Sequence, residues 1–125
     1  MNVWDVASSR PGWTRLAHSA LGVAEAARAA NGQYWREHVQ AVQIGHDTAA
    51  FNTPYGVCIL RDEGDELCVI SFNGHSYAKA FEELRALCRE TGWQTFRAHT
   101  DKESILRYWR KMGITPSEYI YREAV

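Results

Sequence analysis

The sequence predicts one α/β (α+β) domain in which a mixed central β-sheet is flanked by about four helices. The hydrophobic pattern is mainly helical over residues 1–47 and alternates between strands and helices over residues 48–125. A strand, helix, strand unit from Glu66 to His99 has the crossover length that parallel pairing requires. No repeat, low-complexity segment or linker divides the 125 residues, so we expect a single domain over residues 1–125.

The first 47 residues are predicted to hold a short strand and two helices. The weak alternation in "NVWDVA" is typical of an edge strand, which Pro11-Gly12 ends. The alanine-rich run from Trp13 to Ala30 has one apolar helical face and predicts a helix that stops at Asn31-Gly32. After it, "QYWREHVQAVQI" predicts a shorter amphipathic helix that Gly45 closes.

From residue 48 the hydrophobic period changes to that of strands. "TAAFN", "YGVCILR" and "ELCVISF" predict three strands. The last two are expected to form a β-hairpin through "DEGD", where Gly64 can adopt a positive φ. "WQTFRAHT" and the tail "SEYIYREA" predict two further strands.

Two helices are predicted between these later strands. The first has apolar residues at helical spacing from Tyr77 to Cys88, with the Ser76 hydroxyl as its N-cap and Gly92 as its end. The second is predicted to open with a capping box from Thr100 to Glu103 and to end at Gly113. Its residues expected to face inward are Ile105, Tyr108, Trp109 and Met112.

Composition excludes several classes of function. The formal charge is -1, from 14 basic and 15 acidic residues without a long run of one sign, so nucleic acid is not an expected partner. No apolar stretch approaches the roughly 20 residues that span a bilayer, and the N-terminus does not resemble a signal peptide, so we expect no membrane partner and a cytoplasmic protein. Cys58, Cys68 and Cys88 lack metal or redox spacing and are interpreted as reduced core residues, and we predict no metal.

The order of elements in the last 80 residues resembles the GNAT family of N-acetyltransferases. The segments that carry the resemblance are "LRALCRETGWQTFRAHT" and the following "ILRYWRKMGI", and it rests more on order and spacing than on motif identity. It implies a strand that ends in a pyrophosphate loop, a helix, a strand splayed from its neighbour, and acetyl-CoA as the cofactor.

In GNAT proteins the backbone amides of a Q/R-x-x-G-x-G/A loop at a helix N-terminus bind the acetyl-CoA pyrophosphate. Counting back from Gly92 places this motif on Phe72-x-x-His75-x-Tyr77, where no position matches. Allowing a one-residue deletion gives Ser71-x-x-Gly74-x-Ser76, which keeps one glycine and one small residue. The cofactor-binding residues that the resemblance implies are Phe72, Asn73, Gly74, His75, Ser76 and Tyr77.

The resemblance also implies a general acid and a general base. In acetylating members a tyrosine four residues before the helix-ending glycine commonly protonates the CoA thiolate. Trp109 occupies that place here, so Tyr108, one residue earlier, is the candidate acid; its alternative role is that of a packing aromatic. His75 in the loop and Glu66 on the preceding strand are the candidate bases, although a lone histidine at a strand end is more often structural.

Two functions remain open on the sequence. The first is an acetyl-CoA-dependent N-acetyltransferase with a degenerate loop and weak or lost activity. The alternative is a non-catalytic protein, because "PYGVCILRDEGDELCVISF" and "ILRYWRKMGI" also look like small GNAT-like proteins of tailed phages, some of which act in the virion or its assembly. That similarity implies a protein partner or homo-oligomer, and a place in the host cytoplasm or virion. A coenzyme A sensor that binds without transfer is a third possibility.

Overall fold

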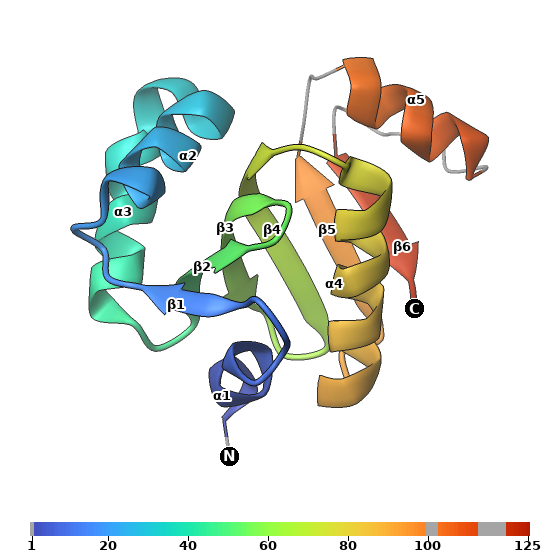
Figure 1. Cartoon of the computed structure of the whole chain (residues 1–125), viewed down its shortest axis with the longest axis horizontal. Helices are drawn as coiled ribbons and strands as arrows, with labels where there is room; N and C mark the ends of the chain where they lie inside the picture. The colour runs from blue at the N-terminus through green and yellow to red at the C-terminus, as the bar shows by residue number, and fades with distance from the viewer. Residues whose placement is uncertain (1, 100–102, 113–119) are drawn as a thin grey trace.

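A computed structural model describes residues 2–99, 103–112 and 120–125 of the chain. The elements are α1 (Val3–Ser8), β1 (Thr14–Leu16), α2 (Leu21–Asn31), a 3₁₀ turn (Gly32–Tyr34), α3 (Trp35–Ile44), β2 (Thr48–Thr53), β3 (Gly56–Asp62), β4 (Glu66–Gly74), α4 (Tyr77–Thr91), β5 (Thr95–His99), α5 (Glu103–Lys111) and β6 (Ile120–Ala124) (Figure 1). None of the helices in these ranges is both long enough and apolar enough to cross a bilayer.

The strands form one mixed sheet in the order β1-β2-β3-β4-β5-β6. All neighbouring pairs are antiparallel except β4 and β5, which are parallel and joined through α4. The predicted hairpin of β3 and β4 and the predicted parallel crossover are both confirmed. The mixed α/β class is therefore confirmed.

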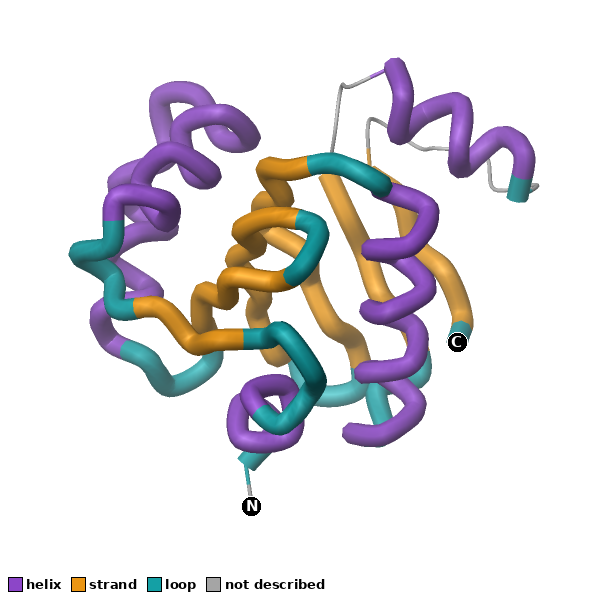
Figure 2. Tube along the Cα trace, in the orientation of Figure 1, coloured by secondary structure: helices purple, strands orange, loops and turns teal. Residues whose placement is uncertain are grey.

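Helices cover both faces of the sheet (Figures 1 and 2). On one face, here called the α4 face, buried residues of α1, α4 and α5 pack on side chains such as Phe51, Leu60 and Phe96. On the opposite face, the α2/α3 face, residues of those two helices pack on Ala50, Ile59 and residues of β4. The chain thus builds two separate hydrophobic clusters, one on each side of the sheet.

The N-terminal segment is a helix and not the edge strand that its alternation predicts. The Asn2 side chain accepts a hydrogen bond from the Asp5 amide, 3.0 Å away, and the Asp5 side chain accepts one from the Asn2 amide, so the two residues form a capping box. Trp4 and Ala7, three residues apart, are buried against the sheet. This burial on one helical face outweighs the weak strand pattern.

The helix predicted from Trp13 to Ala30 begins eight residues later than expected, at Leu21. Residues 14–16 form β1, in which Thr14 pairs with Asn52 and Leu16 with Ala50, and α2 starts only at Leu21. The alanine-rich sequence favours a helix over the whole run, but pairing with the edge of β2 prevails in its first part because helix propensity is a weak preference. The predicted end at Asn31 is confirmed.

The structure confirms most of the predictions about buried residues and contradicts one of them. The three cysteines are free and buried, and the apolar face of α4 packs inward as expected. Trp109 is fully buried and Tyr108 partly so, but Met112 is 50% exposed, because it follows the last residue of α5. Trp4 and Trp13 also lie in the core. The predicted capping box at Thr100 and the helix end at Gly113 lie outside the described residues.

Candidate functional site

The candidate site starts where β4 and β5 separate. The two strands pair from Glu66 opposite Thr95 to Val69 opposite Ala98, and β4 then continues alone on this side to Gly74. The pairing of β4 with β3 also shifts its register at this point, because Ile59 faces Ser71 whereas Leu60 faces Val69. Such a bulge bends the strand. In the described residues, the last five residues of β4 therefore have an edge without a partner strand, and the splay that the resemblance implies is present.

The loop after β4 is held by the tight turn between β2 and β3. A Cβ atom on Gly74 would lie 1.9 Å from the Tyr55 carbonyl oxygen and 2.7 Å from the Gly56 Cα, so only glycine fits. The His75 amide donates a hydrogen bond of 2.8 Å to the same Tyr55 oxygen. Gly74 thus has a structural reason to be glycine, and the His75 amide is already used within the protein.

Ser76 precedes α4 in a left-handed conformation, with φ of 55° and ψ of 49°. The prediction that its hydroxyl caps α4 is wrong, because this backbone turns the side chain away from the first helical amides; the Ser76 Oγ lies 3.1 Å from the His75 Nδ1 instead. Among non-glycine residues a positive φ is uncommon. Only glycine fits at residue 74, and residue 76 has a backbone conformation that glycine favours. These are the two glycine positions of the motif in the alignment that begins at Ser71, so the structure favours that alignment.

The N-terminus of α4 opens into a pocket of about 440 Å³. The amides of the first helical turn have no intrahelical acceptors, and the helix dipole adds positive potential there. From the facing helix α5, Arg107 and Lys111 line the same pocket, one helical turn apart. The described lining contains these two cations and no carboxylate; it consists of Ser76, Tyr77, Ala78, Arg107, Tyr108 and Lys111.

Tyr108 connects this pocket to the interior of the α4 face. Its hydroxyl accepts a hydrogen bond of 2.6 Å from the Arg85 Nη2, and its ring stacks on Phe81 at 5.4 Å. Arg85 is only 7% exposed, and its guanidinium also lies 5.9 Å from the Phe96 ring, two residues before the last paired residue of β5. The Tyr108 hydroxyl consequently lies near the level at which the strands separate.

Trp109, at the place where GNAT proteins commonly have the acid tyrosine, is a core residue. Its ring is fully buried and packs 4.9 Å from the Phe81 ring and 5.6 Å from the Phe96 ring. An indole cannot donate its N–H as a usable acid near neutral pH. The neighbouring Tyr108, which lines the pocket, is the hydroxyl that α5 presents to the site.

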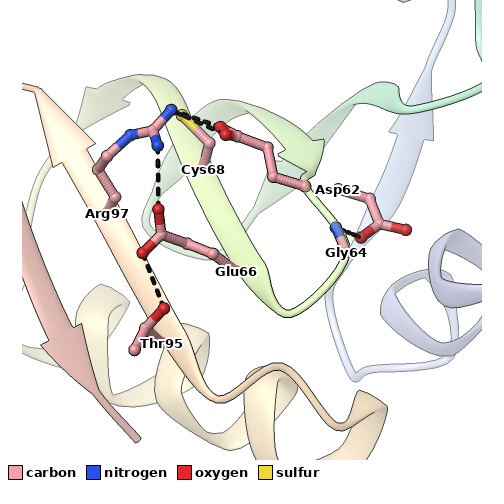
Figure 3. Close-up of polar contacts among 7 residues, drawn as sticks. Asp62, Gly64, Glu66, Cys68, Thr95 and Arg97 are labelled. Atoms are coloured by element: carbon pink, nitrogen blue, oxygen red, sulfur yellow. Dashed lines mark hydrogen bonds and ion pairs between the residues drawn. The ribbon is translucent and has the colours of Figure 1, made fainter.

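Glu66 lies at the other end of β4 from His75, in a polar cluster (Figure 3). One of its carboxylate oxygens accepts a 2.9 Å hydrogen bond from Arg97, and the other accepts a 2.8 Å bond from Thr95. Arg97 also pairs with Glu63 and contacts the Cys68 sulfur at 3.3 Å. Because a strand rises about 3.3 Å per residue, roughly 26 Å separate Glu66 from the end of β4.

The thiol in this cluster is not an activated cysteine. Burial raises the pKa of Cys68, and the nearby Arg97 guanidinium only opposes that shift. In the described part of the chain, no three histidine, cysteine or acidic side chains gather in a way that would hold a metal ion. The cluster fastens the start of β4 to β5, below the point where the strands separate.

The structure brings some of the predicted site residues together and separates others. Ser76 and Tyr77 line one pocket with Tyr108, and His75 adjoins them, whereas Glu66 is remote. Arg85, Arg107 and Lys111 also contribute to the site, although they are not among the residues predicted from the sequence. The spacing of Arg107 and Lys111 on one helical face was a usable signal for a cationic surface, but only the fold shows that it faces the start of α4.

Comparison with known proteins gives relatives by structure only. No protein-family model matches the chain, and no curated protein matches its sequence. It is similar to PaiA N-acetyltransferase of Thermoplasma acidophilum, solved with coenzyme A, with a TM-score of 0.57, 12% identity, and coverage of 90% of this chain and 98% of that one. Ard1 of Thermoplasma volcanium matches with a TM-score of 0.52, 14% identity, and coverage of 91% and 98%.

Another similar structure is that of a protein described as a member of the GNAT family. It is a protein of the GNAT family from Desulfovibrio desulfuricans, described as a candidate acetyltransferase, with a TM-score of 0.55, 14% identity, and coverage of 90% of this chain and 97% of that one. These identities are too low to transfer substrates, but the coverage extends over nearly the whole of both chains. Together with the splayed β4 and β5 and the loop before α4, the similarity establishes that the chain has the GNAT acetyltransferase fold.

Proposed function

We propose that this protein binds acetyl-CoA between β4 and β5 and transfers the acetyl group to an amine. The observation that carries the proposal is the open edge of β4, which leads from the end of its pairing with β5 directly to the cationic pocket at the start of α4. A polar arm with a phosphate group at one end fits this arrangement. The similarity to GNAT acetyltransferases supports the same ligand class.

The phosphate end of the ligand is assigned to the pocket between α4 and α5. Free amides of the first turn of α4 provide hydrogen-bond donors, and Arg107 and Lys111 provide charge from the opposite wall. His75, exposed beside Ser76, contributes a side chain at this end rather than at the reacting centre. The donor set therefore suits a pyrophosphate.

The arm of the ligand is assigned to the free edge of β4. Unpaired backbone groups on a strand edge bind extended chains that carry amides, in the manner of an added strand. The pantetheine arm is extended and carries two amides. Ser76 follows Ser71 by five residue steps, which correspond to about 16 Å of extended chain. An extended arm spans this length and brings its thioester to the point where β4 and β5 separate.

The reaction needs few groups from the protein. When bound, acetyl-CoA supplies an activated thioester, whose carbonyl carbon bonds to the acceptor nitrogen as its bond to sulfur breaks. The proposal assigns to Tyr108 the proton that the departing sulfur takes up, and it is supported by the Arg85 contact, which uses the hydroxyl oxygen as an acceptor and leaves its O–H proton available. Both carboxylate oxygens of Glu66 are engaged far from this point, so the proposal assigns the amine proton to water.

The non-catalytic alternative also has a specific observation in its favour. The His75 amide is committed to Tyr55, and a fully buried tryptophan occupies the place of the usual acid tyrosine. Both features suit a cofactor site adapted to another role, such as binding a protein partner. Binding of coenzyme A separates the transferase from a protein-binding role, because of these two functions only the transferase requires the cofactor.

The test is calorimetric titration of coenzyme A into the wild-type protein and into Arg107→Glu. Loss of one charge-assisted contact, worth about 1.5–3 kcal/mol, weakens binding by about 10- to 100-fold. Arg89→Glu is the matched control, since it makes the same charge change at the exposed, opposite end of α4. Equal binding by Arg107→Glu and Arg89→Glu would exclude the pocket as the phosphate site, and no binding by the wild type would support the non-catalytic role.

A further inference from the structure

Ser71 lies at the bulge of β4, two residues beyond the last residue that pairs with β5. Paired residues on antiparallel strands share a face of the sheet. Ser71 is paired with Ile59, which belongs to the α2/α3 cluster, whereas the next residue, Phe72, packs on the α4 face. Residue 71 therefore lies on the unpaired edge of β4, and its side chain is on the face of the sheet opposite Tyr108.

The Ser71 hydroxyl is buried without a hydrogen-bond partner. The residue is 2% exposed, and in the described part of the chain its Oγ has neither an acceptor nor a donor within bonding distance. Leaving such a group unsatisfied is costly, so buried hydroxyls in native proteins are nearly always hydrogen-bonded. Ile59 and Ile70 next to it are apolar and do not satisfy it.

We propose that the Ser71 hydroxyl donates a hydrogen bond to the carbonyl oxygen of the bound acyl thioester. This inference rests on the proposed function, which places the thioester at the separation of β4 and β5. A serine hydroxyl is a donor that rotates to suit its acceptor, and a carbonyl oxygen is the acceptor that distinguishes an acyl thioester from free coenzyme A. Ser71 is thus a selectivity residue for the acylated cofactor.

The same contact assists the transfer step. When the amine attacks, the carbonyl oxygen gains negative charge, and a donor already in place in an apolar surrounding stabilises that charge more strongly than the neutral ground state. The bulge accounts for the position, because it adds a residue where the strand leaves its partner. Tyr108 then acts on the sulfur from the α4 face while Ser71 acts on the oxygen from the other face.

The experiment compares the affinities of acetyl-CoA and free coenzyme A, so it needs no acceptor and no turnover. Calorimetric dissociation constants are measured for the wild type, Ser71→Ala and Ser71→Cys, with thermal unfolding to verify each fold. The expected result is that Ser71→Ala lowers the preference for acetyl-CoA by about two- to tenfold, the value of one hydrogen bond. Its affinity for free coenzyme A stays unchanged. The preference of Ser71→Cys for acetyl-CoA should lie between those of the wild type and Ser71→Ala, because a thiol is a weaker donor of similar size.

Ser8→Ala is the matched control, because it removes a serine hydroxyl that is bonded to the Trp4 carbonyl at 2.8 Å. It should leave the preference for acetyl-CoA intact, and Ser71→Ala should leave the unliganded protein equally or more stable. The role of Ser71 would be overturned if Ser71→Ala kept the wild-type preference, or if it lost affinity for acetyl-CoA and for free coenzyme A equally. The proposed function would stand in either case. Failure of the wild type to bind either ligand would overturn both.

Discussion

Replacing Tyr108 by phenylalanine tests two roles of one hydroxyl at once. In the folded protein this oxygen accepts a 2.6 Å hydrogen bond from Arg85, whose side chain is 7% exposed. A hydrogen bond to a charged group contributes about 1.5–3 kcal/mol. Arg85 keeps its contact with the Phe96 ring, so we expect a loss near the lower value. For a chain of this size, about 1.5 kcal/mol corresponds to a fall in melting temperature of roughly 5 °C.

The effect on catalysis is expected to be larger than the effect on stability. If Tyr108 protonates the departing sulfur, Tyr108→Phe lowers kcat by about 10² to 10⁴ and leaves the affinity for acetyl-CoA within a few fold. The assay is the initial rate of thiol release from acetyl-CoA, with a primary amine selected by screening the wild-type protein. Urea unfolding of the same preparations gives the free energy of unfolding.

Two further variants separate the roles. Arg85→Lys removes the guanidinium from Tyr108 but leaves its O–H proton, so it should reproduce the loss of stability with a smaller loss of rate. Tyr34→Phe, at an exposed tyrosine 55% accessible to solvent, should change neither quantity. A Tyr108→Phe protein with wild-type kcat would refute the acid role, and one with wild-type stability would refute the structural contribution of the Arg85 contact.

Three other predictions follow from backbone geometry and burial. Ser76→Gly should raise the free energy of unfolding by about 0.5–1 kcal/mol in urea titrations, because it relieves a left-handed residue, and it should strengthen coenzyme A binding. Gly74→Ala should lower that free energy by about 3 kcal/mol or more, since its Cβ would lie 1.9 Å from the Tyr55 oxygen. Gly64→Ala is the control, because Gly64 has open space around it, and it should cost about 1 kcal/mol. Equal losses in the two variants would contradict the close approach at Gly74. Burial raises the pKa of Cys58 from 9.0 to about 12, so the unfolded chain loses this proton first and stability falls as pH rises above 9. Cys58→Ala should therefore reduce the loss of stability between pH 7 and pH 10 by about 1.4 kcal/mol, measured by denaturant unfolding at both values.

The sequence predicts those parts of the fold whose signals are local. The apolar spacing of residues 77–88 and the turn at Gly64 were sufficient for α4 and for the hairpin of β3 and β4. The prediction failed at Thr14–Leu16, where the sequence favours a helix and the structure has a strand. Only the edge of β2, more than thirty residues away in sequence, decides that conformation.

The candidate site also has one part that local sequence predicts and one part that depends on tertiary structure. Its loop was located from the sequence, since an apolar run that ends in Asn73-Gly74 before a helix marks the place. The geometry that gives each residue its role is tertiary. Ser76 has a positive φ next to a loop residue that is bonded to the preceding turn, and Arg107 faces α4 only when α5 is docked. Glu66 was predicted on the correct strand but lies at its opposite end.

The central claim is that the gap between β4 and β5 holds an acyl-CoA, and thermal unfolding with added acetyl-CoA tests it most directly. A ligand that binds only the folded state stabilises it by about 2.7 kcal/mol at 100 times its dissociation constant. The melting temperature of the wild-type protein should rise with acetyl-CoA concentration, and that of Arg107→Glu should rise less. An unchanged melting temperature of the wild-type protein at millimolar acetyl-CoA would contradict it.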